Sequence, residues 1–161
     1  LKIQKCKGAT PIFIKIIKYT NRKNKMLLMK LQSKEKFSFL QLAHYLARVD
    51  NKYGKREEEI ILEYCVEMGI ENLDSFDFEN FSLEKILKDF KSESSKKIVI
   101  LELMILIHID HSFNLNEKIL IQKISDSFGI DISDVNDYSQ WGKSVAMLYE
   151  VAKIFVNEKK I

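Results

Sequence analysis

Apolar residues recur every three or four positions along most of the chain after residue 33, which is the spacing of one face of an α-helix. Few breakers interrupt this spacing, because the sequence holds only five glycines and one proline. No alternating strand pattern or hairpin turn competes with this interpretation. The pattern therefore predicts an all-α bundle of roughly six or seven helices, which we expect at about 33–49, 54–69, 82–90, 96–109, 114–129 and 141–156.

Start and stop signals give the boundaries of these helices. Ser33, Ser82 and Asn114 are residue types that cap helix starts. Gly69 and Gly129 are expected to end two helices in the left-handed conformation, and the isoleucine after each glycine should pack back on the last turn.

Residues 40–81 and 100–141 are two copies of one pattern, aligned without a gap at an offset of 60. Each copy is a helix, a short loop and a second helix. An amphipathic unit of this kind cannot bury its apolar face alone, so we expect the copies to pack about a pseudo-two-fold axis. The identical pairs are Leu46/Leu106, Asp50/Asp110, Glu57/Glu117, Ile61/Ile121, Gly69/Gly129, Ile70/Ile130, Asp74/Asp134 and Asp77/Asp137.

Length and charge indicate one folded domain behind a basic leader. The chain has 161 residues, 46% of them hydrophobic, which is enough for one ordinary core. Residues 1–34 hold ten of the 26 basic residues and none of the 23 acidic ones, so the remainder is acidic. We expect a basic N-terminal extension at 1–29 and an all-helical domain at 30–161, with repeats at about 33–92 and 93–157.

Neither a membrane span nor a disulfide framework is indicated. The most apolar run, 98–109, is interrupted by Glu102 and has about half of the roughly 20 residues that a span needs. We expect it to form a buried core helix. Cys6 and Cys65 show no paired or metal-type spacing, so a reducing, cytoplasmic location is the simplest inference.

The most prominent chemical feature of the repeat is an acidic motif at the helix junction. Hard cations such as Ca²⁺ and Mg²⁺ need several oxygens at one point, so the Asp and Glu of both copies are candidate ligands of a divalent cation. The alternative is that each Glu accepts a free N–H of a helix start and each Asp accepts N–H groups of its own loop. An EF-hand is excluded, because neither loop has Gly at its sixth or Glu at its twelfth position. The motif reads Asp50, Tyr53 and Glu57 in the first copy and Asp110, Phe113 and Glu117 in the second.

This duplicated motif resembles the signature of the TerB family of tellurite-resistance proteins, which includes the N-terminal domain of the membrane-anchored DnaJ-like co-chaperone. The family signature is Ala-Asp-Gly-x-[Ile/Val]-Ser-x-x-Glu, followed by an amphipathic helix, and the resemblance covers roughly residues 30–157. Asp50 and Asp110 match the signature Asp, and Glu57 and Glu117 match the Glu. The chain departs from the signature where Asn51 and His111 replace Gly, Tyr53 and Phe113 replace the aliphatic residue, Gly54 and Asn114 replace Ser, and Val49 and Ile109 replace Ala.

The resemblance implies an all-α two-fold domain without established enzymatic chemistry, linked to tellurite, metal or general stress responses. It also implies that the acidic residues are a candidate metal site. We therefore expect a non-enzymatic TerB-like module that acts through protein partners and is a candidate for binding a divalent cation at its acidic junctions. The alternative is an accessory module whose basic residues 1–25 dock an anionic membrane or nucleic acid, although the acidic body disfavours nucleic acid. The pattern does not determine the oligomeric state.

Two further acidic groups are expected to be ordinary surface features. The first is duplicated at spacing three and predicts loop turns and helix caps, with a binding surface as the alternative. The second is a stripe on one helix, expected to be solvated unless it receives a basic partner or the leader. These groups are Glu71, Asp74 and Asp77 with Asp131, Asp134 and Asp137, and the stripe Glu59, Glu63 and Glu67.

No catalytic site is predicted. No Ser or Cys nucleophile has an evident base partner, and His44 is expected to be a packed helix residue. His108 and His111 could hold a transition metal with Asp110, but histidines at a helix end are more often solvated. Residues 141–144 resemble the end of a phosphate-binding loop, yet Asp137 stands where that motif needs glycine.

Overall fold

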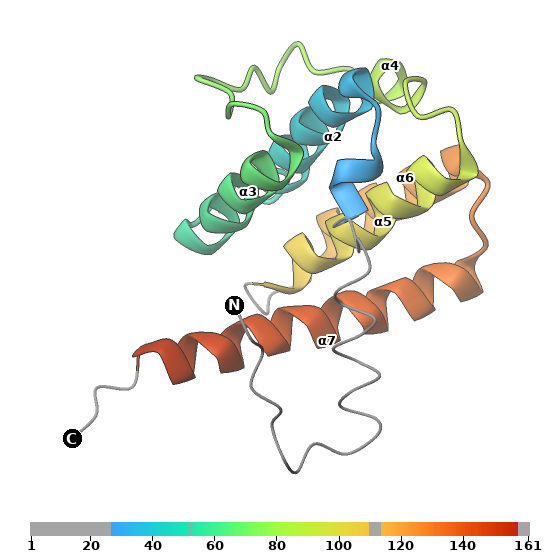
Figure 1. The fold of residues 1–161 in the computed structure, drawn as a ribbon. Coiled ribbons are helices and arrows are strands. Elements are labelled where there is room, and N and C mark those ends of the chain that lie inside the picture. Colours follow the sequence, from blue (N-terminus) through green and yellow to red (C-terminus); the bar gives the residue numbers. More distant parts are fainter. Residues whose placement is uncertain (1–26, 52, 110–113, 158–161) are drawn as a thin grey trace, which may run out of the picture.

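Helices make up all the regular structure in the part of the chain that the structure describes. The computed structural model describes residues 27–51, 53–109 and 114–157. These residues form one 3-10 turn and six α-helices without any strand, which confirms the predicted all-α class. None of these helices is both long and apolar enough to cross a membrane. The elements are η1 (Leu27–Lys30), α2 (Ser33–Leu46), α3 (Lys55–Met68), α4 (Leu83–Leu87), α5 (Glu93–His108), α6 (Leu115–Phe128) and α7 (Ile132–Asn157) (Figure 1).

The central helix of the bundle is α5. It contacts η1, α2, α6 and α7, and Figure 1 shows it between the α2–α3 pair and α7. Ten of its sixteen residues are buried, so it supplies apolar surface to every neighbour. One continuous cluster of buried side chains includes residues from every element. The prediction of a buried core helix at 98–109 is confirmed.

The start of α2 differs from the predicted one. We expected Ser33 as the cap, but Ser33 is the first helical residue and Gln32 is the cap. Buried Glu35 accepts the N–H of Gln32 at 2.8 Å, so a carboxylate satisfies the free donor from inside the helix. The helix ends at Leu46, three residues earlier than expected, and Phe37, which the spacing placed on the apolar face, is 51% exposed.

Two other helices, α5 and α7, begin earlier than the apolar pattern indicates. The side chain of Ser92 accepts the N–H of Ser95 at 3.0 Å, which starts α5 at Glu93. In α7 the N–H of Val135 donates to Asp131 O at 3.0 Å, so the helix begins nine residues before 141. The prediction missed the polar first turn of α5, whereas the first turns of α7 contain Ile132 and the buried Val135.

The helix stops at Gly69 and Gly129 are as predicted. Both glycines have φ angles in the left-handed region, at 66° and 68°. The N–H of the isoleucine after each glycine donates to the carbonyl five residues back, at 3.1 Å after Gly69 and at 3.0 Å after Gly129. The two copies therefore end α3 and α6 in the same way, with the Schellman pattern.

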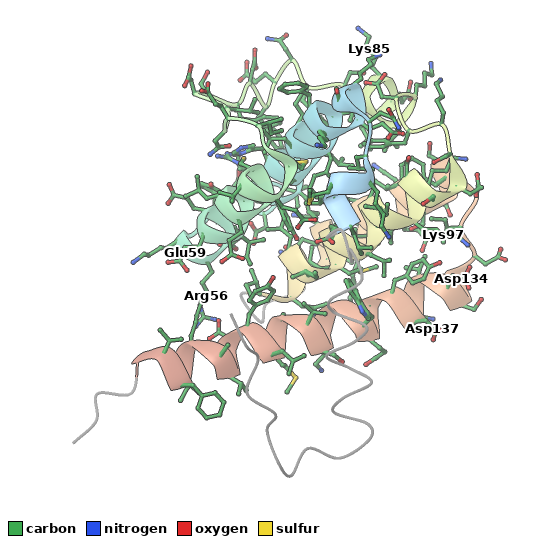
Figure 2. The ribbon with its side chains drawn as sticks, in the orientation of Figure 1. Arg56, Glu59, Lys85, Lys97, Asp134 and Asp137 are labelled. Carbon is green, nitrogen blue, oxygen red and sulfur yellow. The ribbon has the colours of Figure 1, made fainter. Side chains whose placement is uncertain are left out.

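The two copies differ in their third element. It has 5 residues in α4 and 26 in α7. Asp77 fits the prediction of a loop turn, because it accepts the N–H of Asn80 at 3.1 Å. Asp134 lies in the first turn of α7, which is compatible with the predicted helix cap, whereas for Asp137 the prediction is wrong, because it lies further inside the helix (Figure 2). The pseudo-two-fold relation between the halves stays a prediction.

Small residues bring α7 close to α5. Val135, Gly142 and Ala146 are buried and recur on one face of α7. A Cβ atom on Gly142 would lie 2.6 Å from Met104 Cβ and 2.7 Å from the Met104 carbonyl carbon. The two helices therefore approach to a separation that only glycine permits at this position.

Candidate functional site

The two helix junctions that carry the acidic motif lie next to each other. Asn114 Nδ2, at the start of α6, donates to Asp50 Oδ2 at 3.0 Å. In the other direction, Arg56 Nη1 of α3 donates to Ile109 O at 3.3 Å, just after α5. Whether the junctions face each other was the geometric question that the sequence left open, and the described residues place them in contact.

The two motif glutamates occupy helix starts. Glu117 Oε2 accepts the N–H of Asn114 at 2.9 Å, while Asn114 Oδ1 accepts the N–H of Glu117 at 3.0 Å, which completes a capping box. Glu57 Oε2 accepts the N–H of Gly54 at 3.1 Å, and glycine has no side chain to return the bond. Both glutamates are buried, with Glu117 8% and Glu57 9% exposed. The alternative that these two glutamates satisfy helix starts is therefore confirmed.

The predicted metal site stays a prediction. Within the described ranges, no group of three or more His, Cys, Asp or Glu side chains is placed to hold a metal ion. Asp110 and His111 lie outside those ranges, so the four-carboxylate set and the histidine cluster are each described only in part. The basic residues 1–25 also lie outside them.

Ser139 and His108 form a contact that sequence reasoning missed. His108 Nε2 lies 2.9 Å from Ser139 Oγ, the kind of hydrogen bond by which a base activates a nucleophile. Ser139 lies inside α7, where the backbone N–H groups donate to carbonyls one turn back and do not form an oxyanion hole. The pair connects α5 to α7.

His44 is a packed helix residue, as predicted. It is 3% exposed and its ring stacks on Phe76, with 5.8 Å between ring centroids. Arg48 Nη1 lies 2.8 Å from His44 Nδ1, and because arginine can only donate, Nδ1 carries no proton. Nε2 therefore holds the proton and donates to Asn72 Oδ1 at 2.7 Å. The ring is neutral in this arrangement.

Acid should destabilise the protein through His44. Burial, reinforced by the charge of Arg48, lowers the pKa of His44 from its ordinary 6.5 against the opposing hydrogen bond to Asn72. The folded state then binds this proton less readily than the unfolded chain, so the stabilisation is complete above pH 6.5 and is lost as the pH falls through the lowered pKa. We expect urea unfolding midpoints to fall more steeply below pH 6.5 in the wild type than in His44→Gln. Equal slopes in the two proteins would contradict this account, and His108→Gln should retain the His44 contribution.

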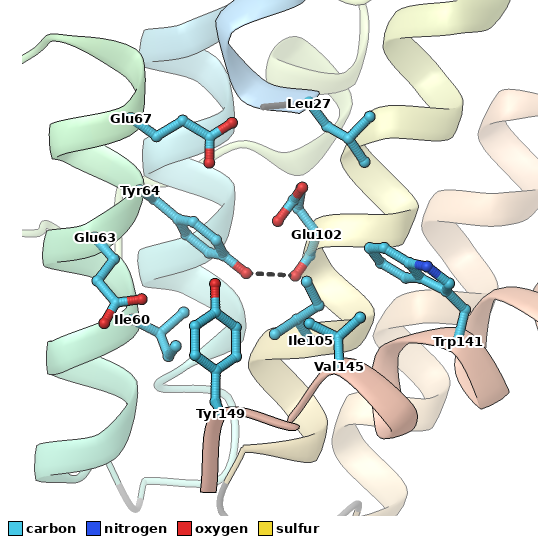
Figure 3. Close-up of a pocket in the computed structure, with 10 residues that line it drawn as sticks. All are labelled: Leu27, Ile60, Glu63, Tyr64, Glu67, Glu102, Ile105, Trp141, Val145 and Tyr149. Carbon is cyan, nitrogen blue, oxygen red and sulfur yellow. Dashed lines mark hydrogen bonds between the residues drawn. The ribbon is translucent and has the colours of Figure 1, made fainter. Parts of the chain in front are cut away.

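A pocket of about 230 Å³ opens between η1, α3, α5 and α7. Glu63 and Glu67 of α3 and Glu102 of α5 form its acidic lining, opposite Trp141 and Tyr149 of α7 (Figure 3). No Lys, Arg or His of the described part of the chain lines it. We call this feature the acidic pocket.

The most unusual group in the acidic pocket is the carboxyl of Glu102. This residue is 6% exposed, and its backbone carbonyl accepts the hydroxyl of Tyr64 at 2.6 Å. Its side chain points into the pocket toward Glu67 (Figure 3) and has no hydrogen-bond donor among the described residues. Burial, followed by the charge of Glu67, raises the pKa of Glu102 to about 8. Glu102 is therefore protonated at neutral pH while no cation is present.

Glu67 and Tyr149 share the acidic environment of the pocket. Burial raises the pKa of Glu67, although the N–H of Leu28 donates to its carboxylate at 2.8 Å. Burial also raises the pKa of Tyr149, followed by the charges of Glu63 and Glu102. Both pKa shifts mean that the pocket disfavours negative charge, and a positively charged ligand would offset the part that comes from neighbouring carboxylates.

The side of α7 opposite its contact with α5 is apolar in the C-terminal half of the helix. Five side chains at spacings of three and four residues are between 45% and 72% exposed. This half of α7 extends beyond the end of α5 (Figure 1). We call this surface the outer face, and it consists of Met147, Leu148, Val151, Ile154 and Phe155.

Some residues of the acidic pocket could be recognised from the sequence. Glu102 stands out as the one charged residue in the apolar run 98–109. Glu63 and Glu67 were visible as a stripe, but a solvated stripe describes only exposed Glu63, because Glu67 is half-buried. The contribution of Trp141 and Tyr149 depends on how α7 packs, so no local pattern could have indicated it.

Comparisons with known proteins give no match: no protein-family model fits the sequence, and no curated protein or solved structure is similar to the chain at a significant level. The resemblance to TerB proteins therefore rests on the duplicated motif alone. The fold and its sites define a class, an all-helical protein with an acidic pocket and an exposed apolar helix face.

Proposed function

We propose that this protein is a non-enzymatic helical module that binds another protein, and that the outer face of α7 is its docking surface. Single exposed apolar residues are ordinary on protein surfaces, but five on one side of one helix form a continuous patch. Covering such a patch removes apolar area from water, which is the main favourable contribution to association. The outer face is the observation that carries this proposal.

An amphipathic helix is the partner that fits the outer face. Apolar residues three, four and seven positions apart form the seam by which one helix pairs with another. The inner side of α7 is held to α3 by two ion pairs, Arg56 with Glu150 at 3.7 Å and Lys153 with Glu59 at 3.2 Å (Figure 2). These pairs are partly exposed and add little stability. The close packing of Gly142 and Ala146 against α5 is what turns the apolar side of α7 outward.

Tellurite, metal or general stress responses are the proposed physiological setting, and this part rests on the TerB resemblance. Asn51 supports it, because its φ of 60° is left-handed at the position where the family signature has glycine. The contact between Asp50 and Asn114 also supports it, because a shared cation site needs adjacent junctions. Capping by Glu57 and Glu117 favours a structural role for those two carboxylates.

Crosslinking in cells tests the docking surface. We expect a photo-crosslinking amino acid placed at Leu148 or Phe155 to give a discrete adduct with a different protein in the cells that make this chain. The same probe at Lys97, an exposed position of α5, should give none (Figure 2). No adduct from either position of the outer face would contradict the proposal, and an adduct with a second copy would replace the proposed partner by self-association.

A double variant separates binding from folding. Leu148→Ser with Phe155→Ser should abolish the adduct from a probe at Val151. Its free energy of unfolding should stay within about 0.5 kcal/mol of the wild type, because both side chains are exposed. If the stress setting is right, cells carrying this variant should be as sensitive to tellurite as cells without the protein.

A further inference from the structure

We propose that the acidic pocket binds a primary alkylammonium group, with Glu102 as its buried counter-charge. This site is separate from the outer face, and the proposal does not depend on the docking function.

Glu102 provides the first argument, because it is a buried residue whose carboxyl group faces the pocket without a hydrogen-bond partner among the described residues. Buried carboxylates are normally hydrogen-bonded or paired, since removing an unpaired charge from water costs several kcal/mol. Glu102 is 6% exposed and faces the pocket, where the described residues supply no donor to its side chain. A ligand with a hydrogen-bond donor could enter the pocket and bind the Glu102 carboxyl group.

The charge of the lining provides the second argument. Glu63, Glu67 and Glu102 are all acidic, and Tyr64 and Tyr149 add two hydroxyl groups. No basic side chain of the described ranges compensates them. The ligand that this lining favours is therefore positively charged and carries several N–H donors.

The walls of the pocket favour an organic cation over a metal ion. Among the described residues, no group of three or more His, Cys, Asp or Glu side chains is placed to hold a metal ion. Trp141 and Tyr149 present aromatic surface, which attracts ammonium groups through cation–π interaction. Ile60, Ile105 and Val145 line the rest, where an alkyl stem can pack.

The volume sets the size of the ligand. About 230 Å³ is smaller than the pockets that hold drug-sized molecules, which begin at about 300 Å³. It suits a single alkylammonium chain, such as the side chain of lysine or one end of a short amine. Two sources supply this chemistry: a free amine, or a lysine of this chain's basic leader, since Lys23 and Lys25 lie four and two residues before Leu27, which lines the pocket.

Binding should release a proton. The groups that face Glu102 are Glu63, Glu67 and Tyr64 from α3 and Tyr149 from α7, and none of them is cationic. An ammonium ion in the pocket stabilises the ionised form of Glu102, which is protonated below a pKa of about 8. Affinity should therefore rise about tenfold for each pH unit between pH 6 and pH 7.5.

Trp141 offers a direct readout, because it is the only tryptophan of the chain and it lines the pocket. We would titrate the full chain with n-butylammonium chloride at pH 7.5 and follow tryptophan fluorescence, using n-butanol as the uncharged probe of similar shape. A saturable change with the amine and none with the alcohol is expected. Glu102→Gln should weaken the affinity about tenfold or more, whereas Glu58→Gln, an exposed carboxylate of α3 outside the pocket, should leave it unchanged.

The same titration of Lys23→Gln with Lys25→Gln distinguishes the two sources. If a leader lysine occupies the pocket, this variant should bind n-butylammonium about tenfold or more tightly than the wild type, because the internal competitor is gone. If the source is a free amine, the variant and the wild type should bind alike. The proposal is overturned if neither protein gives a saturable change, or if n-butanol produces the same change as the amine.

Discussion

Glu102→Gln is expected to stabilise the folded protein by about 3 kcal/mol at pH 7 while the acidic pocket holds no amine. The pKa of Glu102 is raised from 4.5 to about 8 in the folded state by burial and then by Glu67. The folded state therefore binds this proton more tightly than the unfolded chain, so its contribution to stability is complete below pH 4.5 and is lost as the pH rises through 8. Glutamine has the shape of the protonated side chain and does not titrate. The variant therefore keeps the stability that the wild type loses as the pH rises.

Urea unfolding at several pH values measures this effect. The difference in free energy of unfolding between Glu102→Gln and the chain with Glu102 should vanish near pH 4.5, grow by about 1.4 kcal/mol for each pH unit above it, and level off above pH 8. Both chains should carry Lys23→Gln and Lys25→Gln, so that the nearest leader lysines cannot neutralise the carboxylate. Glu58→Gln is the matched control and should show no such trend. A loss of stability in Glu102→Gln at pH 7 would show that the ionised carboxylate is required by the fold.

Gly142→Ala is expected to lower the free energy of unfolding by about 2 kcal/mol. In an exposed helix the same change would stabilise by about 0.5–1 kcal/mol, because alanine is the better helix former. At Gly142 the added Cβ would lie 2.6 Å from Met104 Cβ and 2.8 Å from the Met104 carbonyl oxygen. Those atoms belong to the α5 backbone or are fixed to it, so the clash can be relieved only by moving α7 away from α5.

The sign of the Gly142→Ala effect decides between close packing and helix propensity. Lys143→Ala, at the exposed neighbouring position, should change stability by less than about 0.5 kcal/mol. Met104→Ala should not rescue Gly142→Ala, because the contacts are with atoms that alanine retains. The variant should also bind n-butylammonium more weakly, since Trp141 and Val145 line the acidic pocket from the same helix. A gain in stability would contradict the close approach of the two helices.

Local sequence signals predicted the helix ends well where one residue fixes the backbone. Gly69 and Gly129 adopt the left-handed conformation because they lack a Cβ, and Asn114 caps α6 with its own side chain. The start of α2 was predicted incorrectly because the donor is satisfied by Glu35, a residue inside the helix. The start of α7 was missed because Asp131, Asp134 and Asp137 were interpreted as loop turns and helix caps, although Ile132, Val135 and Tyr138 recur there at a spacing of three residues.

For the acidic motif, the sequence predicted which residues matter but not which of two roles they have. The residue types admitted both a cation site and helix capping, and both interpretations used Glu57 and Glu117. The structure assigns these two side chains to N–H groups of their own helix starts. The partners of Asp50 could not be predicted, because its contact with Asn114 spans 64 residues and depends on how the two copies pack.

The sequence by itself determined the helical class, the stops of α3 and α6, and the burial of α5, because these follow from side-chain spacing and from backbone preferences within a few residues. Only the tertiary structure decided that the junctions meet, that α7 lies against α5 at Gly142, and that Glu102 faces Glu67 in a pocket. Those features join residues far apart in the chain. Their energies depend on burial and on neighbouring charge, and both quantities exist only once the helices have packed.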